Sequence, residues 1–328
     1  MDRAGNPKKA LNWRSVVPGL LTILILALIL RYIHRNADHL KELLNLSTAT
    51  IAALFCVALA LVLFNGLSNY TLFRGLGAKL TLNEGIGLAT VNSMANQLTF
   101  ATGGLITISV YLKKRFGISY SYFLSAALAL YIIAVSANGV MGVLVLGWWI
   151  VAARIRVPVI LLLGFAAMAS SVLLFKLPLQ SVVLPTSWKD RLSRLFTGIQ
   201  TLTENRPLVG KLLCYQFLLV LLYSVQLYIS FHTLSQKVSV GQCVLFSAAN
   251  ILTQAISFTP DALGVREAVI GGVATLLGYD FGASVIAVGL SRLVSMPTII
   301  TGGSIYAYFL SRKAVRRELP SLDSDPNR

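Results

Sequence analysis

Apolar runs of about twenty residues recur along this chain, and they constrain its fold more than any other feature. A helix needs about 20 such residues to cross roughly 30 Å of hydrocarbon. Charged residues make up only 12% of the chain, whereas a soluble domain carries about 25%. The sequence therefore predicts an all-α fold, a polytopic helical bundle in a membrane. The candidate spans are residues 16–33, 48–68, 84–112, 119–152, 157–175, 207–231, 240–277 and 283–310.

These runs group into one integral membrane domain, which we predict over residues 16–310. Its first half covers about 16–152, and its second half covers about 157–310. We expect residues 1–15 to form a cytoplasmic N-terminal segment. The basic tail, residues 311–328, is rich in polar residues and is expected to be disordered.

The longest polar segment between spans covers residues 176–206. Within it, Trp188, Leu192, Leu195 and Ile199 recur at spacings of three and four, with basic residues between them. This pattern predicts an amphipathic helix that lies on the cytoplasmic interface. A connector helix packed against the bundle fits the same spacing.

Two of the apolar runs are interrupted, at residues 102–104 and at residues 259–264. The stretch NSMANQLTFATGGL, from Asn92, aligns with NILTQAISFTPDAL, from Asn250, at an offset of 158 residues. Paired interruptions in corresponding halves are typical of transporter binding sites. We therefore predict two re-entrant segments related as an inverted repeat. The identities are few, so a chance likeness is the alternative.

The distribution of Lys and Arg favours the re-entrant arrangement. If both interrupted runs are re-entrant and residues 119–152 cross once, the cytoplasmic segments hold 20 of the 28 basic residues. If residues 84–112 cross fully and 119–152 cross twice, the number is 17. We predict a multi-pass protein of a bacterial inner membrane with both termini in the cytoplasm.

Charge is concentrated at the second interruption. Asp261, Arg266 and Glu267 lie within seven residues, around a Pro-Asp-Ala-Leu-Gly break. A charge at bilayer depth costs roughly 2.5–3.5 kcal/mol, so such residues face a partner, a cavity or a ligand. Arg292 falls near the middle of the last run, where the same argument holds. A short surface loop between two spans is the plain alternative.

These charges suit an anionic head group. Arg266 begins the helix after the break, where free N–H groups and a positive dipole favour a phosphate. We predict that Arg266 and Arg292 hold the head group, while Asp261 and Glu267 act as gating charge partners. The alternative is that the arginines pair internally with these two carboxylates.

Uncharged residues complete the predicted site. Gly103 and Gly104 would let backbone approach a ligand closely in the first half. Asn92 and Asn250 would supply hydrogen-bonding groups on the approaching helices. As internal contacts between helices, such amides contribute roughly 0.6 kcal/mol each.

Other classes of site lack their sequence patterns. The three Cys and three His show no metal-ligand spacing, so we predict no metal and no cofactor. Nucleotide-binding and hydrolase motifs are absent, and two carboxylates at membrane depth are a poor acid and base set, so we predict no enzyme activity. The net charge of +16 suits an anionic membrane surface rather than nucleic acid, because the basic residues flank apolar runs.

The stretch SFTPDALGVREAV resembles the Pro-Gly-Gly-x-Gly-x-Arg-Glu motif of the lysylphosphatidylglycerol synthase/flippase transmembrane family, and Arg292 matches an arginine in its following span. TFATGGLITISVYLKKRFGIS resembles the upstream partner motif. Asp261 and Ala262 stand where that family has glycines, and the first motif lacks its proline, glutamate and arginine. Full-length synthases append a soluble aminoacyl-transferase domain. The sequence ends eighteen residues after Leu310, so we expect that domain to be lacking.

The resemblance and the charges together predict a protein that binds and translocates an anionic lipid, either a phospholipid or a polyprenyl-phosphate-linked lipid. One alternative is a non-catalytic subunit that presents lipid to a separate glycosyl- or aminoacyl-transferase. Another is an intramembrane lipid-modifying enzyme that uses Glu267 as its base.

Overall fold

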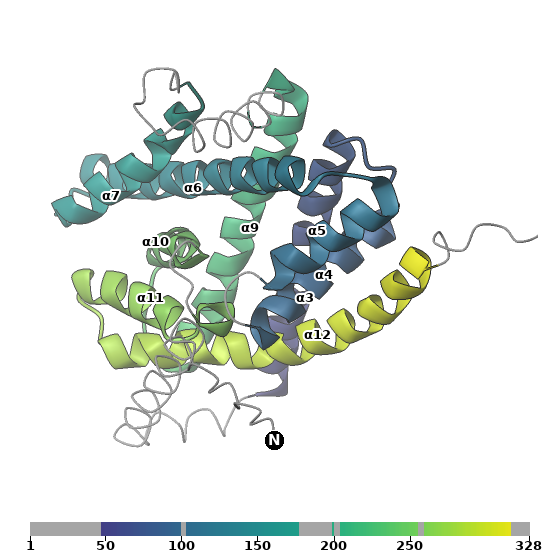
Figure 1. The fold of residues 1–328 in the computed structure, drawn as a ribbon. Helices are drawn as coiled ribbons and strands as arrows, with labels where there is room; N and C mark the ends of the chain where they lie inside the picture. Colours follow the sequence, from purple (N-terminus) through teal and green to yellow (C-terminus); the bar gives the residue numbers. More distant parts are fainter. Residues whose placement is uncertain (1–46, 100–102, 177–198, 200–203, 255–258, 316–328) are drawn as a thin grey trace, which may run out of the picture.

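The computed structural model describes residues 47–99, 103–176, 199, 204–254 and 259–315, and the regular elements in these ranges are helices (Figure 1). This confirms the predicted all-α bundle. Four helices in the described ranges are long and apolar enough to cross a membrane. They are α3 (Thr48–Gly75), α6 (Tyr120–Val151), α9 (Arg206–Thr233) and α12 (Phe281–Val315).

Several predicted segments lie outside the described residues. These are the N-terminal segment 1–15, the first predicted span 16–33, most of the predicted connector 176–206, and the tail from residue 316. The expectations for them stay predictions.

Each half places two shorter helices between two long ones. Both interruptions are present, since one separates α4 from α5 and the other separates α10 from α11. Helix α4 packs against α12, and α10 packs against α6, so each interrupted segment contacts the last long helix of the other half (Figure 1). The inverted orientation of the halves stays a prediction. The shorter helices are α4 (Leu82–Leu98), α5 (Gly103–Phe116), α10 (Val240–Asn250) and α11 (Val265–Leu276).

Capping residues explain where the shorter helices begin. Thr81 accepts a hydrogen bond from the Glu84 backbone, and the Glu84 carboxylate accepts one from the Thr81 N–H. Ser239 and Gln242 form the same reciprocal pair at the start of α10. These capping boxes satisfy backbone N–H groups that a helix start leaves free.

Helix α6 is continuous, so the run 119–152 forms a single 32-residue helix. The run 157–175, predicted as one span, instead contains the 12-residue α7 (Val159–Ser170) followed by the 3₁₀ helix η1 (Ser171–Lys176). The change occurs where α7 meets α6. There, Ser136 donates a hydrogen bond to the Ala169 carbonyl at 2.9 Å, and Gly139 leaves the space that α7 occupies.

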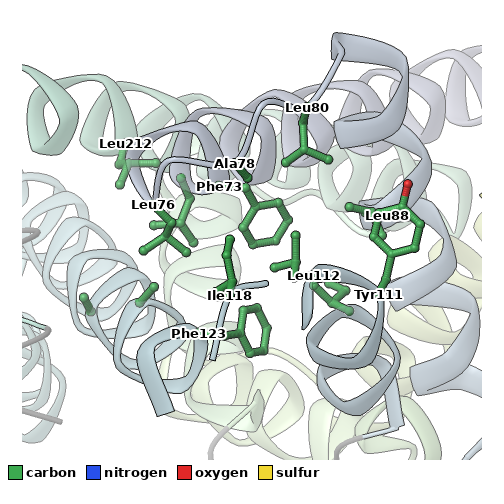
Figure 2. Packing of buried hydrophobic residues seen from close by; sticks show 14 of the residues in the cluster. Phe73, Leu76, Ala78, Leu80, Leu88, Tyr111, Leu112, Ile118, Phe123 and Leu212 are labelled. Carbon is green, nitrogen blue, oxygen red and sulfur yellow. The ribbon is translucent and has the colours of Figure 1, made fainter. Parts of the chain in front are cut away.

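The largest apolar core holds the first half together and joins it to the start of α9 (Figure 2). The rings of Phe73 in α3 and Phe123 in α6 lie 6.1 Å apart, with Leu112 of α5 nearby in the same cluster. Leu212 of α9 and Leu310 of α12 belong to this cluster as well. Because lipid tails are as apolar as leucine, such packing stabilises the bundle chiefly through van der Waals contact.

A buried carboxylate ties three helices at one end of the bundle. Glu84 of α4 is 2% exposed and lies 2.8 Å from Arg115 of α5 and 3.4 Å from Lys313 of α12. Burial alone would raise the pKa of Glu84. The Thr81 N–H and the charges of Arg115 and Lys313 outweigh burial, so the pKa of this carboxyl lies below its ordinary value.

We therefore predict that Glu84→Gln lowers the thermal unfolding midpoint in detergent, at a cost of roughly 1–3 kcal/mol for a lost buried charged partner. A lowered folded pKa contributes stability that is present above the unfolded value of about 4.3 and is lost as the pH falls through the folded value. The difference in unfolding midpoint between wild type and Glu84→Gln should therefore be complete above about pH 5 and should shrink below about pH 4. A difference in unfolding midpoint that does not change with pH would contradict this account.

Candidate functional site

The second interruption adopts a strained backbone. Between α10 and α11 the chain forms two short 3₁₀ helices, η3 (Ile251–Gln254) and η4 (Pro260–Ala262). Asp261 and Ala262 have φ angles of 48° and 54°, and Gly264 has a φ of 82°. The left-handed region costs a non-glycine residue roughly 1–2 kcal/mol. The family resemblance implies glycine at 261 and 262, whereas this chain holds a left-handed backbone there with Asp and Ala, which lack glycine's freedom.

The Asp261 side chain lies between two guanidinium groups. Its Oδ1 is 3.1 Å from Arg266 Nη2, and its Oδ2 is 3.0 Å from Arg292 Nη2. The Asp261 carbonyl also accepts a hydrogen bond from Arg292 Nη2 at 2.7 Å. One residue in a left-handed conformation therefore joins the start of α11 to the middle of α12.

Glu267 completes this charge cluster, which we define as Asp261, Arg266, Glu267 and Arg292. Arg292 Nη1 donates to Glu267 Oε1 at 2.5 Å, and Glu267 Oε2 accepts the Gly264 N–H at 2.7 Å. Arg292 is 8% exposed and Glu267 6% exposed. Both arginines are thus paired internally, as the alternative predicted, and the cluster carries two positive and two negative charges.

A cavity of about 640 Å³ opens beside the charge cluster and is lined by residues from both halves. Its volume falls within the range of about 300–1,000 Å³ that is usual for ligand sites. The structure brings five of the predicted site residues to this cavity, whereas Glu267 lies behind Arg292. The five are Asn92, Asn250, Asp261, Arg266 and Arg292.

The two predicted glycines lie where α5 begins beside α4. Gly104 donates its backbone N–H to Asn96 Oδ1 at 3.0 Å, and a Cβ there would lie 2.2 Å from Asn92 Oδ1. A Cβ on Gly103 would collide with Thr99. Neither glycine is among the cavity-lining residues of the described chain. Both glycines therefore allow α5 to start close against α4, and their role in ligand binding stays a prediction.

Sequence reasoning missed the polar groups that the long helices contribute. Asn65 and Asn69 of α3, Asn138 of α6, and Gln216 and Tyr223 of α9 line the cavity. Four of these polar residues lie inside predicted apolar runs and Asn69 directly follows one, which is the signal that would have revealed them. The apolar runs alone do not predict which helices pack together, and this packing is what brings these residues to one cavity.

The chemistry that this arrangement allows is recognition of an anion by charge exchange. A carboxylate and a phosphate accept the same forked guanidinium hydrogen bonds. Within the described residues, no group of three or more His, Cys, Asp and Glu side chains could hold a metal ion. The site thus offers paired charges and amides.

Comparison with known families identifies a related membrane region. Residues 16–303 match the model of a family described as the lysylphosphatidylglycerol synthase TM region. The match covers both interruptions and every residue of the charge cluster. Comparison with curated proteins gives no match.

The strain at the break yields a stability prediction. Ala262→Gly should raise the free energy of unfolding by about 1 kcal/mol, because glycine relieves the left-handed strain at some entropic cost. Ala137→Gly, at a buried position of α6, is the matched control and should lower it by roughly 1–2 kcal/mol, through helix propensity and the loss of a buried methyl group. Thermal unfolding in detergent measures both. Equal destabilisation by the two changes would refute the strain.

Proposed function

The chain belongs to the lysylphosphatidylglycerol synthase transmembrane family, and from this premise we propose that it binds an anionic lipid in the cavity and moves it across the bilayer. The observation that carries the proposal is the position of Asp261. Its carboxylate is held by two guanidinium groups on the wall of a polar cavity inside an apolar bundle.

Asp261 occupies the place that suits a lipid phosphate. A phosphodiester carries one negative charge and accepts forked hydrogen bonds, as a carboxylate does. Exchanging one for the other leaves the charge balance at the arginines unchanged. The Arg266 Nε atom is buried and has no hydrogen-bond partner among the described residues, so this guanidinium retains donor capacity for an arriving anion.

The exposure of the four charges divides them into a fixed pair and an exchangeable pair. The Arg292 and Glu267 side chains are each 8% exposed, whereas Arg266 is 18% and Asp261 26% exposed. Arg292 with Glu267 therefore forms the anchor, and the contact between Arg266 and Asp261 opens when a head group enters. Closing it again releases the lipid.

The bundle architecture supports translocation. Cavities at broken helices between two halves are typical of transporters that alternate access around a central site. Here both interrupted segments contribute lining, through Asn92 of the first and Asp261 of the second. Glu267 is less suited to act as an enzymatic base, because Arg292 and the Gly264 N–H engage its two carboxylate oxygens.

The test is lipid translocation in proteoliposomes that contain fluorescent phosphatidylglycerol, read by chemical quenching of the outer leaflet. We expect wild type to accelerate translocation and Arg266→Gln to reduce the rate about tenfold or more, since a charged hydrogen bond contributes roughly 1.5–3 kcal/mol. Arg156→Gln changes an exposed arginine outside the cavity and should leave the rate unchanged.

Full activity in Arg266→Gln would overturn the site. Wild-type liposomes no faster than empty ones would overturn translocation, and a stable complex with a lipid-using transferase would then favour the lipid-presenting subunit.

A further inference from the structure

Helix α12 carries a proline at its middle. Pro297 divides the helix into a first arm, residues 281–296, and a second arm, residues 298–315. Proline has no N–H, so the Leu293 carbonyl lacks the hydrogen bond that residue 297 would donate in a regular helix, and the ring crowds that carbonyl. Sharp bends in helices occur almost always at such residues. Figure 1 shows that α12 changes direction along its length.

The first arm packs with the second half of the chain. Its residues Ile286, Ala287 and Val288 are buried in an apolar cluster with residues of α9, α10 and α11, which we call the second core. Further along the same arm, Arg292 pairs with Glu267 of α11. The first arm therefore forms one packed body with α11 and the charge cluster.

Gln226 of α9 holds the first arm up to the proline. Its side-chain amide donates to the Ser291 carbonyl at 3.1 Å and to Ser295 Oγ at 2.7 Å. Gln226 is 2% exposed, so these hydrogen bonds form in a buried setting. They support the last turn before Pro297 and leave the turn after it to other contacts.

The second arm packs with the first half of the chain. Its Leu310 is buried in the largest apolar core, which also contains residues of α3, α4 and α5. Tyr306 donates its phenolic hydrogen to Asn83 Oδ1 at 2.8 Å, and Lys313 Nζ lies 3.4 Å from Glu84 Oε1. The polar contacts of this arm thus reach the start of α4.

Glycines bring the second arm and α4 into close contact. A Cβ on Gly303 would lie 2.5 Å from the Cβ of Met94, and a Cβ on Gly87 would lie 2.5 Å from the ring of Tyr306. Contacts this tight leave no room for the two helices to slide past each other. The second arm and α4 therefore form a second packed body.

Pro297 lies at the junction of these two bodies, and the cavity extends across it. Arg292 and Ser295 of the first arm and Ile299 of the second arm all line the cavity. Hinge motions occur where packed bodies join at a few residues that absorb the change in backbone angle. A change of bend at Pro297 would therefore change the shape of the cavity wall.

Helix α9 also runs through both cores, since Leu212 belongs to the largest core and Leu227 to the second. Its proline, Pro207, lies in the first turn, where proline is compatible with a regular helix. Among the four long helices, α12 is the one with a proline in its interior.

We propose that Pro297 is the hinge of translocation. The first arm stays with α11 and the charge cluster, while the second arm swings together with α4. This motion couples the exchange of Asp261 for a lipid phosphate to a change in the opening of the cavity. The inference rests on the proposed function, since it names the element that moves when the lipid crosses.

The first test measures translocation of fluorescent phosphatidylglycerol in proteoliposomes. Pro297→Ala restores the missing N–H at an exposed position, so it should keep or raise the unfolding midpoint. It should nevertheless lower the rate about tenfold or more, because it stiffens the hinge. Pro297→Gly keeps a weak point in the helix and should retain most of the wild-type rate. Pro207→Ala is the matched control and should leave the rate unchanged.

The second test measures the motion itself with spin labels in nanodiscs. Labels at Ala268→Cys on α11 and Ser311→Cys on the second arm, both exposed, report the distance between the two bodies. The exposed Cys56 and Cys214 are replaced by serine. We expect two distance populations whose proportions differ between phosphatidylglycerol and phosphatidylcholine nanodiscs, and a single population when Pro297→Ala is added.

The outcomes separate the hinge from the proposed function. A wild-type rate in Pro297→Ala, equal losses in Pro297→Ala and Pro297→Gly, or the same distance distribution with and without Pro297→Ala would each overturn the hinge and leave lipid translocation intact. A wild-type protein that does not translocate lipid would overturn the proposed function. The spin labels then decide on the hinge alone, with two populations reduced to one by Pro297→Ala supporting it.

Discussion

Two guanidinium groups share one carboxylate in the second half of this bundle, and much of the site depends on that contact. Without it, Asp261 and Ala262 would hold a left-handed backbone with no compensation, and Arg292 would keep a single acidic partner within α11. The contact fixes the start of α11 against α12. It also gives a neutral charge balance inside an apolar bundle, where an unpaired arginine would be costly.

The two halves contribute different chemistry to one cavity. The second half supplies all four charges of the cluster, whereas the first half supplies uncharged amides such as Asn92 and Gln97. In the first half, Gly104 contacts α4, and the described residues on either side of that break, 96–99 and 103–105, are uncharged. In the described residues the halves thus follow the same order of long and short helices, and the charge cluster lies at the second break.

Much of this architecture was predictable from the sequence, because hydrophobic length and helix-breaking residues act locally. Both interruptions follow from such signals. The run 119–152 was compatible with one span or two, and internal pairing of Arg292 was the alternative to binding a head group, so the structure decides both. The short length of α7 does not follow from local signals, because it depends on contacts with Ser136 and Gly139 of α6. Nor do the amides of α3 and α9, because a polar residue on a long apolar helix shows its role only when helix packing places it. The close contact of Gly104 with α4 depends likewise on tertiary structure.

The central claim is that the charge cluster holds a lipid phosphate within the bundle. Native mass spectrometry of protein gently extracted from membranes, with lipids that co-purify from the cell, tests it most directly. We expect wild type and Arg156→Gln to retain a phosphodiester lipid, and Arg266→Gln to lose it. The same lipid retained equally by wild type and by Arg266→Gln, or no lipid on wild type, would contradict the account.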